Sequence, residues 1–335
     1  MRGFVVEKFA HPRDITLSTN APEPKLGPQQ VLVDVYSAGL NFYDILQAQG
    51  KHQNLIKPPF TLGTEMAGRI SADSPIPKGC SLKPGQRVFG TAQGSYADRV
   101  AANINQLLPL PDNLTFDQGA GIHVTWPTSY EALVGRAQLK AGEWVLVTAA
   151  AGGVGIAAAQ LAHALGAKVI AAAGSEEKLT ICKKYGAADY TINYSNPGWQ
   201  KEVLKITGGK GVDVVYDPVG LVQDSLKCIA WKGRALVVGF AAGKIEKLPL
   251  NLVLLKNISI VGIHWGAYYT KEPEHIAPGV WEPLLELLSS GKATPVVFNK
   301  VFPLKDLSQG LEALERRETW GKVIVRIKDE HSSKL

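Results

Sequence analysis

The stretch 147-VTAAAGGVGIAAAQLAHALGAKVIAAAGSEEK-178 joins an apolar β-like run, a glycine-rich turn and an alanine-rich helix-like run. A backbone without Cβ can turn tightly at these glycines. It also lets a pyrophosphate approach the helix N-terminus, where N–H groups and the helix dipole favour anions. The order strand, glycines, helix therefore predicts a dinucleotide site at Gly152, Gly153 and Val154.

The surrounding sequence alternates strands and helices, which indicates βαβ units and a parallel sheet. The β-like runs are 144–148, 168–173, 213–217, 235–239 and 258–263, and the helical runs between them are 154–165, 176–186, 199–206 and 222–230. We therefore expect an α/β protein whose nucleotide-binding domain spans about 124–264.

The segments on either side have a different pattern. Residues 1–123 contain short β runs separated by Pro and Gly, such as 30-QVLVDVYSAG-39 with alternating valines, and predict a mostly β domain. The tail is expected to form a helix at 278–291, a strand at 295–303, a helix at 306–315 and a strand at 322–327. This mixed pattern predicts that 265–335 is a return segment that completes the first domain.

The end of the second β run bears on cofactor choice. A carboxylate that would hold a ribose hydroxyl is expected there, but the sequence has Ala173-Gly174-Ser175. A 2′-phosphate needs cations and neutral donors instead, and Gly174, Ser175 and Lys178 supply them, with Tyr194 as a further wall. NADPH is therefore the predicted cofactor, and a solvated helix lysine is the alternative interpretation of Lys178.

Composition restricts the other functions. The 335 residues suit two domains, and the net charge of +6 has no long basic block, so nucleic acid is not an expected partner. No apolar run reaches the length of a membrane span, and no signal-peptide pattern begins the chain. The three scattered cysteines indicate a reducing compartment.

Ser333-Lys334-Leu335 is a peroxisomal import tripeptide, so the import receptor is an expected partner, and a cytoplasmic location is the alternative.

Several motifs together resemble the zinc-free quinone oxidoreductase branch of the medium-chain dehydrogenase/reductase superfamily. They are 38-AGLNFYDIL-46, 63-GTEMAGRI-70, 83-KPGQRVFG-90, 148-TAAAGGVG-155, 191-TINY-194, 214-VVYDPVG-220 and 235-ALVVGFAAG-243, and the resemblance covers essentially the whole chain. It implies a GroES-like substrate domain beside a Rossmann domain, with the active cleft between them. It also implies homodimers paired through the strand at 258–263.

The resemblance also bears on zinc. Zinc-dependent relatives have ligands where this chain has Asn41, Thr64 and Val124, and none of these is a plausible zinc ligand. The expected reaction is metal-free hydride transfer to a quinone or an α,β-unsaturated carbonyl. His52, His123 and His264 have no acid or cysteine at metal or triad spacing.

Site residues follow from the family positions. Asn41 and Asp44 would line the nicotinamide site, and Asn41 would donate a hydrogen bond either to the substrate or to a cofactor hydroxyl. Tyr43 would be a proton donor or stacking wall, with a packed aromatic as its alternative. The family often has an aromatic where this chain has Leu46, so substrate preference stays open. Three more residues are expected near the cofactor: Thr128 (otherwise a helix cap), Phe240, and Arg317 (otherwise a surface arginine).

Two other functions compete with quinone or enone reduction. The first is an NADPH-dependent 2-enoyl thioester reductase, which needs basic residues for the CoA phosphates; Lys51, Lys57 and Lys244 are the candidates. The second is a non-enzymatic NADPH-binding protein, which would bind the cofactor without turnover.

Overall fold

The computed structural model describes residues 1–52, 55–243 and 245–330, and the chain divides into two compact units. Unit 1 comprises Met1–Val124 and Pro295–Leu335, and unit 2 comprises Thr125–Thr294. The C-terminal tripeptide and Lys244, both singled out from the sequence, lie outside the described residues.

Unit 2 is built on a parallel six-stranded sheet with the order β11-β10-β9-β12-β13-β14. Its strands are β9 (Trp144–Val147), β10 (Lys168–Ala173), β11 (Tyr190–Asn193), β12 (Val212–Asp217), β13 (Ile229–Val237) and β14 (Ser259–Gly262). This is the doubly wound order, which brings the carboxyl ends of β9 and β12 together at the point where the strand order reverses.

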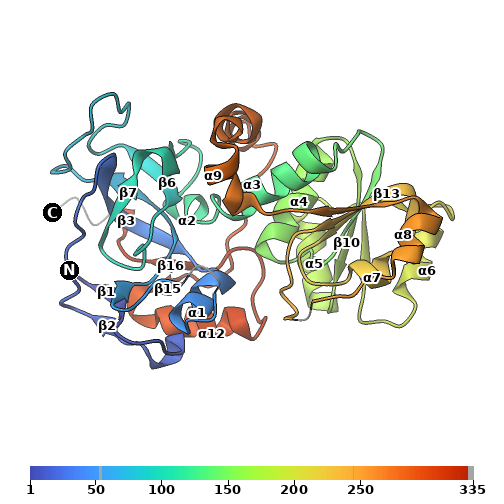
Figure 1. The fold of residues 1–335 in the computed structure, drawn as a ribbon, viewed down its shortest axis with the longest axis horizontal. Helices are drawn as coiled ribbons and strands as arrows, with labels where there is room; N and C mark the ends of the chain where they lie inside the picture. Colours follow the sequence, from blue (N-terminus) through green and yellow to red (C-terminus); the bar gives the residue numbers. More distant parts are fainter. Residues whose placement is uncertain (53–54, 244, 331–335) are drawn as a thin grey trace. The chain divides into compact units, whose positions relative to one another are not determined.

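Helices cover both faces of this sheet. They are α4 (Gly153–Ala164), α5 (Glu176–Tyr185), α6 (Trp199–Ile206), α7 (Val222–Ser225) and α8 (Leu250–Lys256). In Figure 1, α4 and α5 lie on one side of the sheet, and α6, α7 and α8 lie on the other. Continuous apolar runs such as 145–147 and 169–173 are buried between these layers because both faces of the sheet are covered.

The sequence prediction differs from unit 2 in three places. It did not include β11, whose four residues are only partly apolar, or the short helix α8. The helix expected over 222–230 ends at Ser225, because β13 already begins at Ile229.

The predicted return segment also begins too early, since residues 265–294 belong to unit 2. They form η4 (Trp265–Ala267), α9 (Tyr268–Lys271), α10 (Pro273–His275), η5 (Ile276–Trp281) and α11 (Glu282–Ser289). Glu131, which is buried, accepts hydrogen bonds from the Tyr268 hydroxyl (2.7 Å) and His275 Nε2 (3.0 Å). These bonds hold the segment against the first helices of unit 2, so the return to unit 1 starts at Pro295.

Unit 1 contains a seven-stranded sheet with β15-β16-β3-β5-β6-β8 in order and β7 paired to β3. The strands are β3 (Gln30–Gly39), β5 (Glu65–Ile70), β6 (Arg87–Thr91), β7 (Arg99–Asn103), β8 (Leu107–Pro109), β15 (Phe302–Pro303) and β16 (Ile324–Arg326). A smaller sheet has the order β2-β1-β4, formed by β1 (Gly3–Val6), β2 (Leu17–Ser18) and β4 (Phe60–Thr61). The antiparallel pairing of β16 with β3 joins the tail of the chain to its first domain.

Short helices complete unit 1. They are η1 (Pro12–Asp14), α1 (Phe42–Ala48), η2 (Ile104–Gln106), α2 (Phe116–Gly119), η6 (Leu304–Asp306) and α12 (Leu307–Glu315), while α3 (Thr125–Tyr130) and η3 (Glu131–Arg136) begin unit 2. Figure 1 shows α1 beside α12. The strand expected over 295–303 is reduced to β15 and one bridge between Val297 and Lys322.

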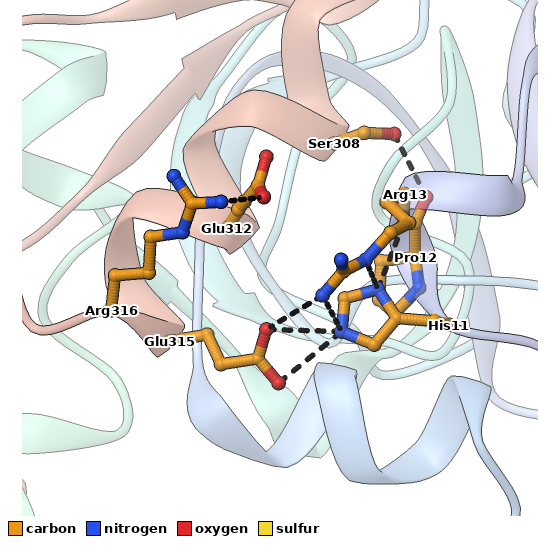
Figure 2. Close-up of polar contacts among 7 residues, drawn as sticks. All are labelled: His11, Pro12, Arg13, Ser308, Glu312, Glu315 and Arg316. Atoms are coloured by element: carbon orange, nitrogen blue, oxygen red, sulfur yellow. Dashed lines mark hydrogen bonds and ion pairs between the residues drawn. The ribbon is translucent and has the colours of Figure 1, made fainter.

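A polar cluster ties the N-terminal segment to α12 (Figure 2). His11 Nδ1 accepts from the backbone N–H of Arg13 at 3.2 Å, so Nε2 carries the proton and donates to Glu315 at 3.0 Å. The Ser308 hydroxyl donates to the carbonyl of Pro12 at 2.9 Å. These bonds fix η1 on the return segment, and the two ends of the chain therefore stabilise one unit.

Candidate functional site

The glycine-rich turn between β9 and α4 has the geometry that the sequence predicted. Gly152 is the N-cap of α4 and has no side-chain capping bond, so the first-turn N–H groups of Gly153 and Val154 are available to an anion. A Cβ on Gly155 would lie 2.5 Å from the carbonyl oxygen of Ala149. Only glycine therefore allows this helix to start so close to the turn.

A second group of predicted residues lies where β10 and β11 end. Ser175 is the N-cap of α5, and its hydroxyl accepts the backbone N–H of Lys178 at 3.4 Å. A Cβ on Gly174 would lie 3.2 Å from Cε2 of Tyr194, so the tyrosine ring stands against the bare glycine backbone. The Ser195 hydroxyl donates to the Gly174 carbonyl at 3.0 Å. The structure thus gathers Gly174, Ser175, Lys178 and Tyr194, and adds Ser195.

An acidic residue that the sequence analysis did not weigh also belongs to this group. Glu176 follows Ser175 and is exposed, and its Oε1 accepts from Asn193 Nδ2 at 2.9 Å. A carboxylate near the end of β10 is the group that binds ribose hydroxyls in dinucleotide sites. In the sequence, this Glu directly follows Gly174-Ser175. Its presence argues against predicting NADPH from the absence of an acidic residue at this strand end.

Two loops follow the central strands of unit 2. The buried carboxylate of Asp217 accepts the backbone N–H groups of Val219, Gly220 and Leu221 at 3.3, 2.9 and 2.8 Å, and also the hydroxyl of Thr148. The loop after β13 is bound to this turn through N–H groups of residues 241 and 242 that donate to carbonyls of residues 218 and 219. Phe240 lies in that loop and is 42% exposed, so its ring is accessible.

Thr128 lies inside α3 and is not its cap, so the alternative interpretation of this residue as a helix cap is wrong. The neighbouring Ser129 donates to the Thr125 carbonyl (2.9 Å), and its hydroxyl lies 3.0 Å from the carbonyl oxygen of Val154. The Ser129 hydroxyl also lies 2.9 Å from that of Tyr216. Ser129 therefore connects α3, the helix that contains Thr128, to the first turn of α4.

Unit 1 holds a separate polar cluster around the start of α1. Asn41 and Asp44 form a capping box, and Asp44 accepts from the Asn41 N–H (2.9 Å), the Tyr96 hydroxyl (2.5 Å) and the Thr64 hydroxyl (3.0 Å). Asp44 is 0% exposed. Burial raises the pKa of Asp44 to about 6, against the opposing effect of these hydrogen bonds. Asp44 is therefore a buried helix-capping group, whereas Asn41 is only partly buried.

The same cluster contains an ion pair that sequence reasoning missed. Lys322 Nζ lies 2.6 Å from Glu65 Oε2 and donates to Asn41 Oδ1 at 2.6 Å. Glu65 Oε1 accepts the backbone N–H of Val124 at 2.9 Å. A Glu inside the motif 63-GTEMAGRI-70 and a Lys at the head of the apolar run 322-KVIV-325 were the available signals.

The remaining predicted residues of unit 1 differ in their surroundings. The Tyr43 hydroxyl accepts from Gln47 Nε2 at 2.8 Å, its ring meets His52 edge-on, and burial raises its pKa. Phe42, which the sequence analysis passed over, is 45% exposed beside Asn41. Arg317 is exposed and follows α12 in unit 1.

Within 1–52, 55–243 and 245–330, no group of three or more His, Cys, Asp or Glu side chains is arranged to hold a metal ion. The described part of the chain also has no helix of the length and apolarity needed to cross a bilayer. Burial lowers the pKa of His123 to about 3, so this histidine is neutral at physiological pH.

Comparison with known proteins agrees with this architecture. The family described as the alcohol dehydrogenase GroES-like domain matches residues 27–112, and the family described as zinc-binding dehydrogenase matches residues 153–290. The two matches correspond to a medium-chain dehydrogenase/reductase, and they confirm the predicted α/β fold with a GroES-like domain and a Rossmann domain.

The relatives define the branch. Quinone oxidoreductase-like protein 2 homolog of Nematostella vectensis is 37% identical over 90% of this chain and 83% of its own length. The Rattus norvegicus quinone oxidoreductase-like protein 2 is 36% identical over 94% of this chain and 89% of its own. Quinone oxidoreductase of Escherichia coli, solved with NADPH, has a TM-score of 0.85 and 29% identity over 98% of this chain and 100% of its own. The chain belongs to the quinone oxidoreductase branch of the medium-chain dehydrogenase/reductase superfamily and is an oxidoreductase, as its motifs predicted.

Proposed function

We propose that this chain is a zinc-independent oxidoreductase that uses NADPH to reduce a quinone or an α,β-unsaturated carbonyl. The observation that carries the proposal is the uncapped N-terminus of α4 at Gly152, which is suited to a pyrophosphate, in a chain of the quinone oxidoreductase branch. The quinone oxidoreductases of Escherichia coli and Thermus thermophilus were both solved with NADPH, which supports this cofactor here.

The residues in unit 2 fit a dinucleotide. The N–H groups of Gly153 and Val154 would bind the pyrophosphate, and Gly174 with the adjacent Tyr194 ring would lie beside the adenosine ribose. Thr128 and Phe240 are the proposed contacts at the nicotinamide end. Ser175 and Lys178 would bind the 2′-phosphate.

The preference for NADPH over NADH depends on the balance between Lys178 and Glu176. Substituting Lys178→Ala should weaken NADPH binding at least tenfold and change NADH binding little, because only the 2′-phosphate uses that cation. Glu176→Gln is the matched control, and it should favour NADPH because it removes a negative charge. Equal weakening of both cofactors by Lys178→Ala would refute the phosphate assignment.

The chemistry needs few protein groups. When bound, NADPH supplies the hydride, and a quinone or enone accepts the electron pair while one proton completes the reduction. The partly buried amide of Asn41 would donate to the acceptor's carbonyl oxygen, which gains negative charge as the hydride arrives. The exposed ring of Phe42 and the partly buried ring of Tyr43 would provide an apolar surface for a flat acceptor.

The chemistry of the donor set supports a zinc-independent reaction. Asn41 offers an amide and Thr64 a hydroxyl, neither of which is a usual zinc ligand. The two carboxylates near them are already engaged, since Glu65 pairs with the Lys322 ammonium and Asp44 accepts from the Thr64 and Tyr96 hydroxyls. We expect the purified protein to contain far less than one zinc per chain by elemental analysis. Stoichiometric zinc that is lost in Asn41→Ala would contradict this mechanism.

The direct test is oxidation of NADPH and NADH against 9,10-phenanthrenequinone, an enal and a trans-2-enoyl-CoA, measured side by side. Turnover of the quinone or the enal with NADPH is the expected result. Turnover of the enoyl-CoA alone would establish the thioester reductase alternative. NADPH binding without turnover of any acceptor would favour the binding-protein alternative.

Two further proposals concern assembly and location. We propose a homodimer formed through β14, which is the edge strand of the unit 2 sheet, and the neighbouring helix α8, where Leu250, Leu254 and Leu255 are 75%, 77% and 68% exposed. We also propose peroxisomal import through Ser333-Lys334-Leu335, with the cytoplasm as the alternative location.

A further inference from the structure

Lys322 has an unusually enclosed side chain for a lysine. The side chain is 7% exposed, that of its partner Glu65 is 0% exposed, and the two charged groups are 2.6 Å apart. The Lys322 ammonium makes a second short contact of 2.6 Å to Asn41 Oδ1. A buried ion pair rarely adds net stability relative to apolar side chains of the same size, so its presence next to Asn41 points to another role.

The backbone makes room for this lysine. A Cβ on Gly39 would lie 2.8 Å from Lys322 Cε, and a Cβ on Gly121 would lie 2.7 Å from Lys322 Cγ. Pairing between β16 and β3, continued by a bond from the Leu40 N–H to the Val323 carbonyl at 2.9 Å, sets the register that directs Lys322 along these two glycines. The position of the ammonium is therefore determined by the fold and is not left to a mobile side chain.

The contact also determines which way the Asn41 amide faces. An ammonium can only donate, so the atom beside Lys322 must be the carbonyl oxygen Oδ1, and the NH₂ group must face away from it. Within the described part of the chain, that NH₂ group contacts the Gly39 carbonyl at 3.4 Å and Glu65 Oε2 at 3.3 Å, and both distances are long for a hydrogen bond. An acceptor oxygen at an ordinary distance of about 2.9 Å would make a better bond than either of them.

We propose that Lys322 and Glu65 are positioning residues that hold the Asn41 amide with its NH₂ group turned to the acceptor's carbonyl oxygen. The ammonium on Oδ1 also draws electron density from the amide and makes its N–H a stronger donor. Glu65 holds the ammonium in place and receives the Val124 N–H on its other oxygen. The inference rests on the proposed function, because Asn41 is the group through which the pair acts.

The test uses the full chain and a double-mutant cycle. The paired variant Lys322→Met with Glu65→Gln removes both charges while keeping side-chain volume, and Asn41→Ala removes the amide. With 9,10-phenanthrenequinone, the paired variant should lower kcat about 10- to 100-fold, which is less than the roughly 100- to 1000-fold cost of removing one oxyanion donor outright, and the KM for NADPH should be unchanged. Added to Asn41→Ala, it should cause no further loss. Lys305→Met, an exposed lysine of the same return segment, is the matched control and should leave kcat unchanged.

A spectroscopic measurement separates this inference from the proposed activity. In ¹⁵N-labelled protein, the side-chain NH₂ signal assigned to Asn41 by its disappearance in Asn41→Ala should move in the paired variant and stay in place in Lys305→Met. If the paired variant fails to fold, Lys322→Gln with Glu65→Gln keeps hydrogen-bonding groups without charge and should move the same signal.

An unmoved Asn41 signal, or additive losses of kcat, would overturn the positioning role. If the wild-type protein turns over no acceptor, the proposed function fails. The NH₂ signal then still decides whether the pair orients Asn41.

Discussion

Replacing Asp44 by asparagine should distinguish a structural carboxylate from a catalytic one. In the wild-type protein, Asp44 Oδ2 accepts from the Asn41 N–H and the Tyr96 hydroxyl, and Oδ1 accepts from the Thr64 hydroxyl. In Asp44→Asn the amide oxygen can keep the first two donors, and the amide NH₂ can donate to a rotated Thr64 hydroxyl. The capping box therefore keeps its hydrogen bonds without a buried negative charge.

The magnitude follows from the pKa of Asp44, which burial raises from the ordinary value of 3.8 to about 6. Between these two values the folded chain holds a proton that the unfolded chain releases, so the free energy of unfolding falls as pH rises through this window. The difference of about 2 pH units corresponds to about 3 kcal/mol, lost progressively between about pH 4 and pH 7. Asp44→Asn should lack this loss and be at least as stable as the wild type at pH 7.

The assay is urea unfolding followed by circular dichroism at several pH values between about 4 and 7, for the wild type, Asp44→Asn and Asp44→Ala. The alanine variant should be less stable by about 2–5 kcal/mol at every pH, because it removes the helix cap and leaves buried donors without an acceptor. If the stability difference between wild type and Asp44→Asn does not change with pH, hydrogen bonding outweighs burial and the reasoning is wrong. If Asp44→Asn is stable but loses kcat more than a hundredfold, Asp44 takes part in the chemistry, as the sequence suggested.

Three other predictions can be tested separately. Gly155→Ala should weaken NADPH binding at least tenfold and lower the melting temperature, because its Cβ would lie 2.5 Å from the Ala149 carbonyl; unchanged binding by fluorescence titration would contradict the tight-turn argument. Leu254→Glu, on the exposed face of α8, should convert dimers to monomers in analytical ultracentrifugation, and an unchanged mass would exclude α8 from the interface. Deleting Ser333-Lys334-Leu335 should move a protein with an N-terminal fluorescent tag from peroxisomes to the cytosol, and continued import would refute the targeting proposal.

The parts of the site that the sequence predicted are those determined within a short stretch of chain. Gly152, Gly153 and Val154 lie between a strand and a helix in one continuous segment, and the requirement for glycine there is local. Gly174, Ser175 and Lys178 follow the next strand in the same way. The order of strands and helices in unit 2 was predicted for a similar reason, because hydrophobic runs and turn residues are read within windows of about ten residues.

The return segment was harder to predict because its boundary depends on side chains from distant elements. Nothing within 265–294 indicates that this segment packs in unit 2, since the anchor is Glu131, which lies 144 positions before His275. Tyr268 and His275 have no pattern of their own that requires a buried carboxylate. The prediction therefore assigned the segment to the wrong unit by relying on its mixed helix and strand content.

The ion pair of Lys322 and Glu65 shows why the rest of the site could not be found from local patterns. Asn41 and Lys322 are 281 positions apart and meet only because β16 pairs with β3 in one register. A shift of one residue in that register would turn Lys322 to the other face of the sheet. Two glycines in the sequence, Gly39 and Gly121, are related to this contact, because a Cβ atom added at either position would overlap the Lys322 side chain. A glycine leaves space for a neighbouring side chain, but the sequence does not identify that side chain until the strand pairing is known. The contacts of Asn41 with Lys322 and Glu65 are therefore a consequence of the sheet topology, and the motif around Asn41 contains only part of this polar cluster.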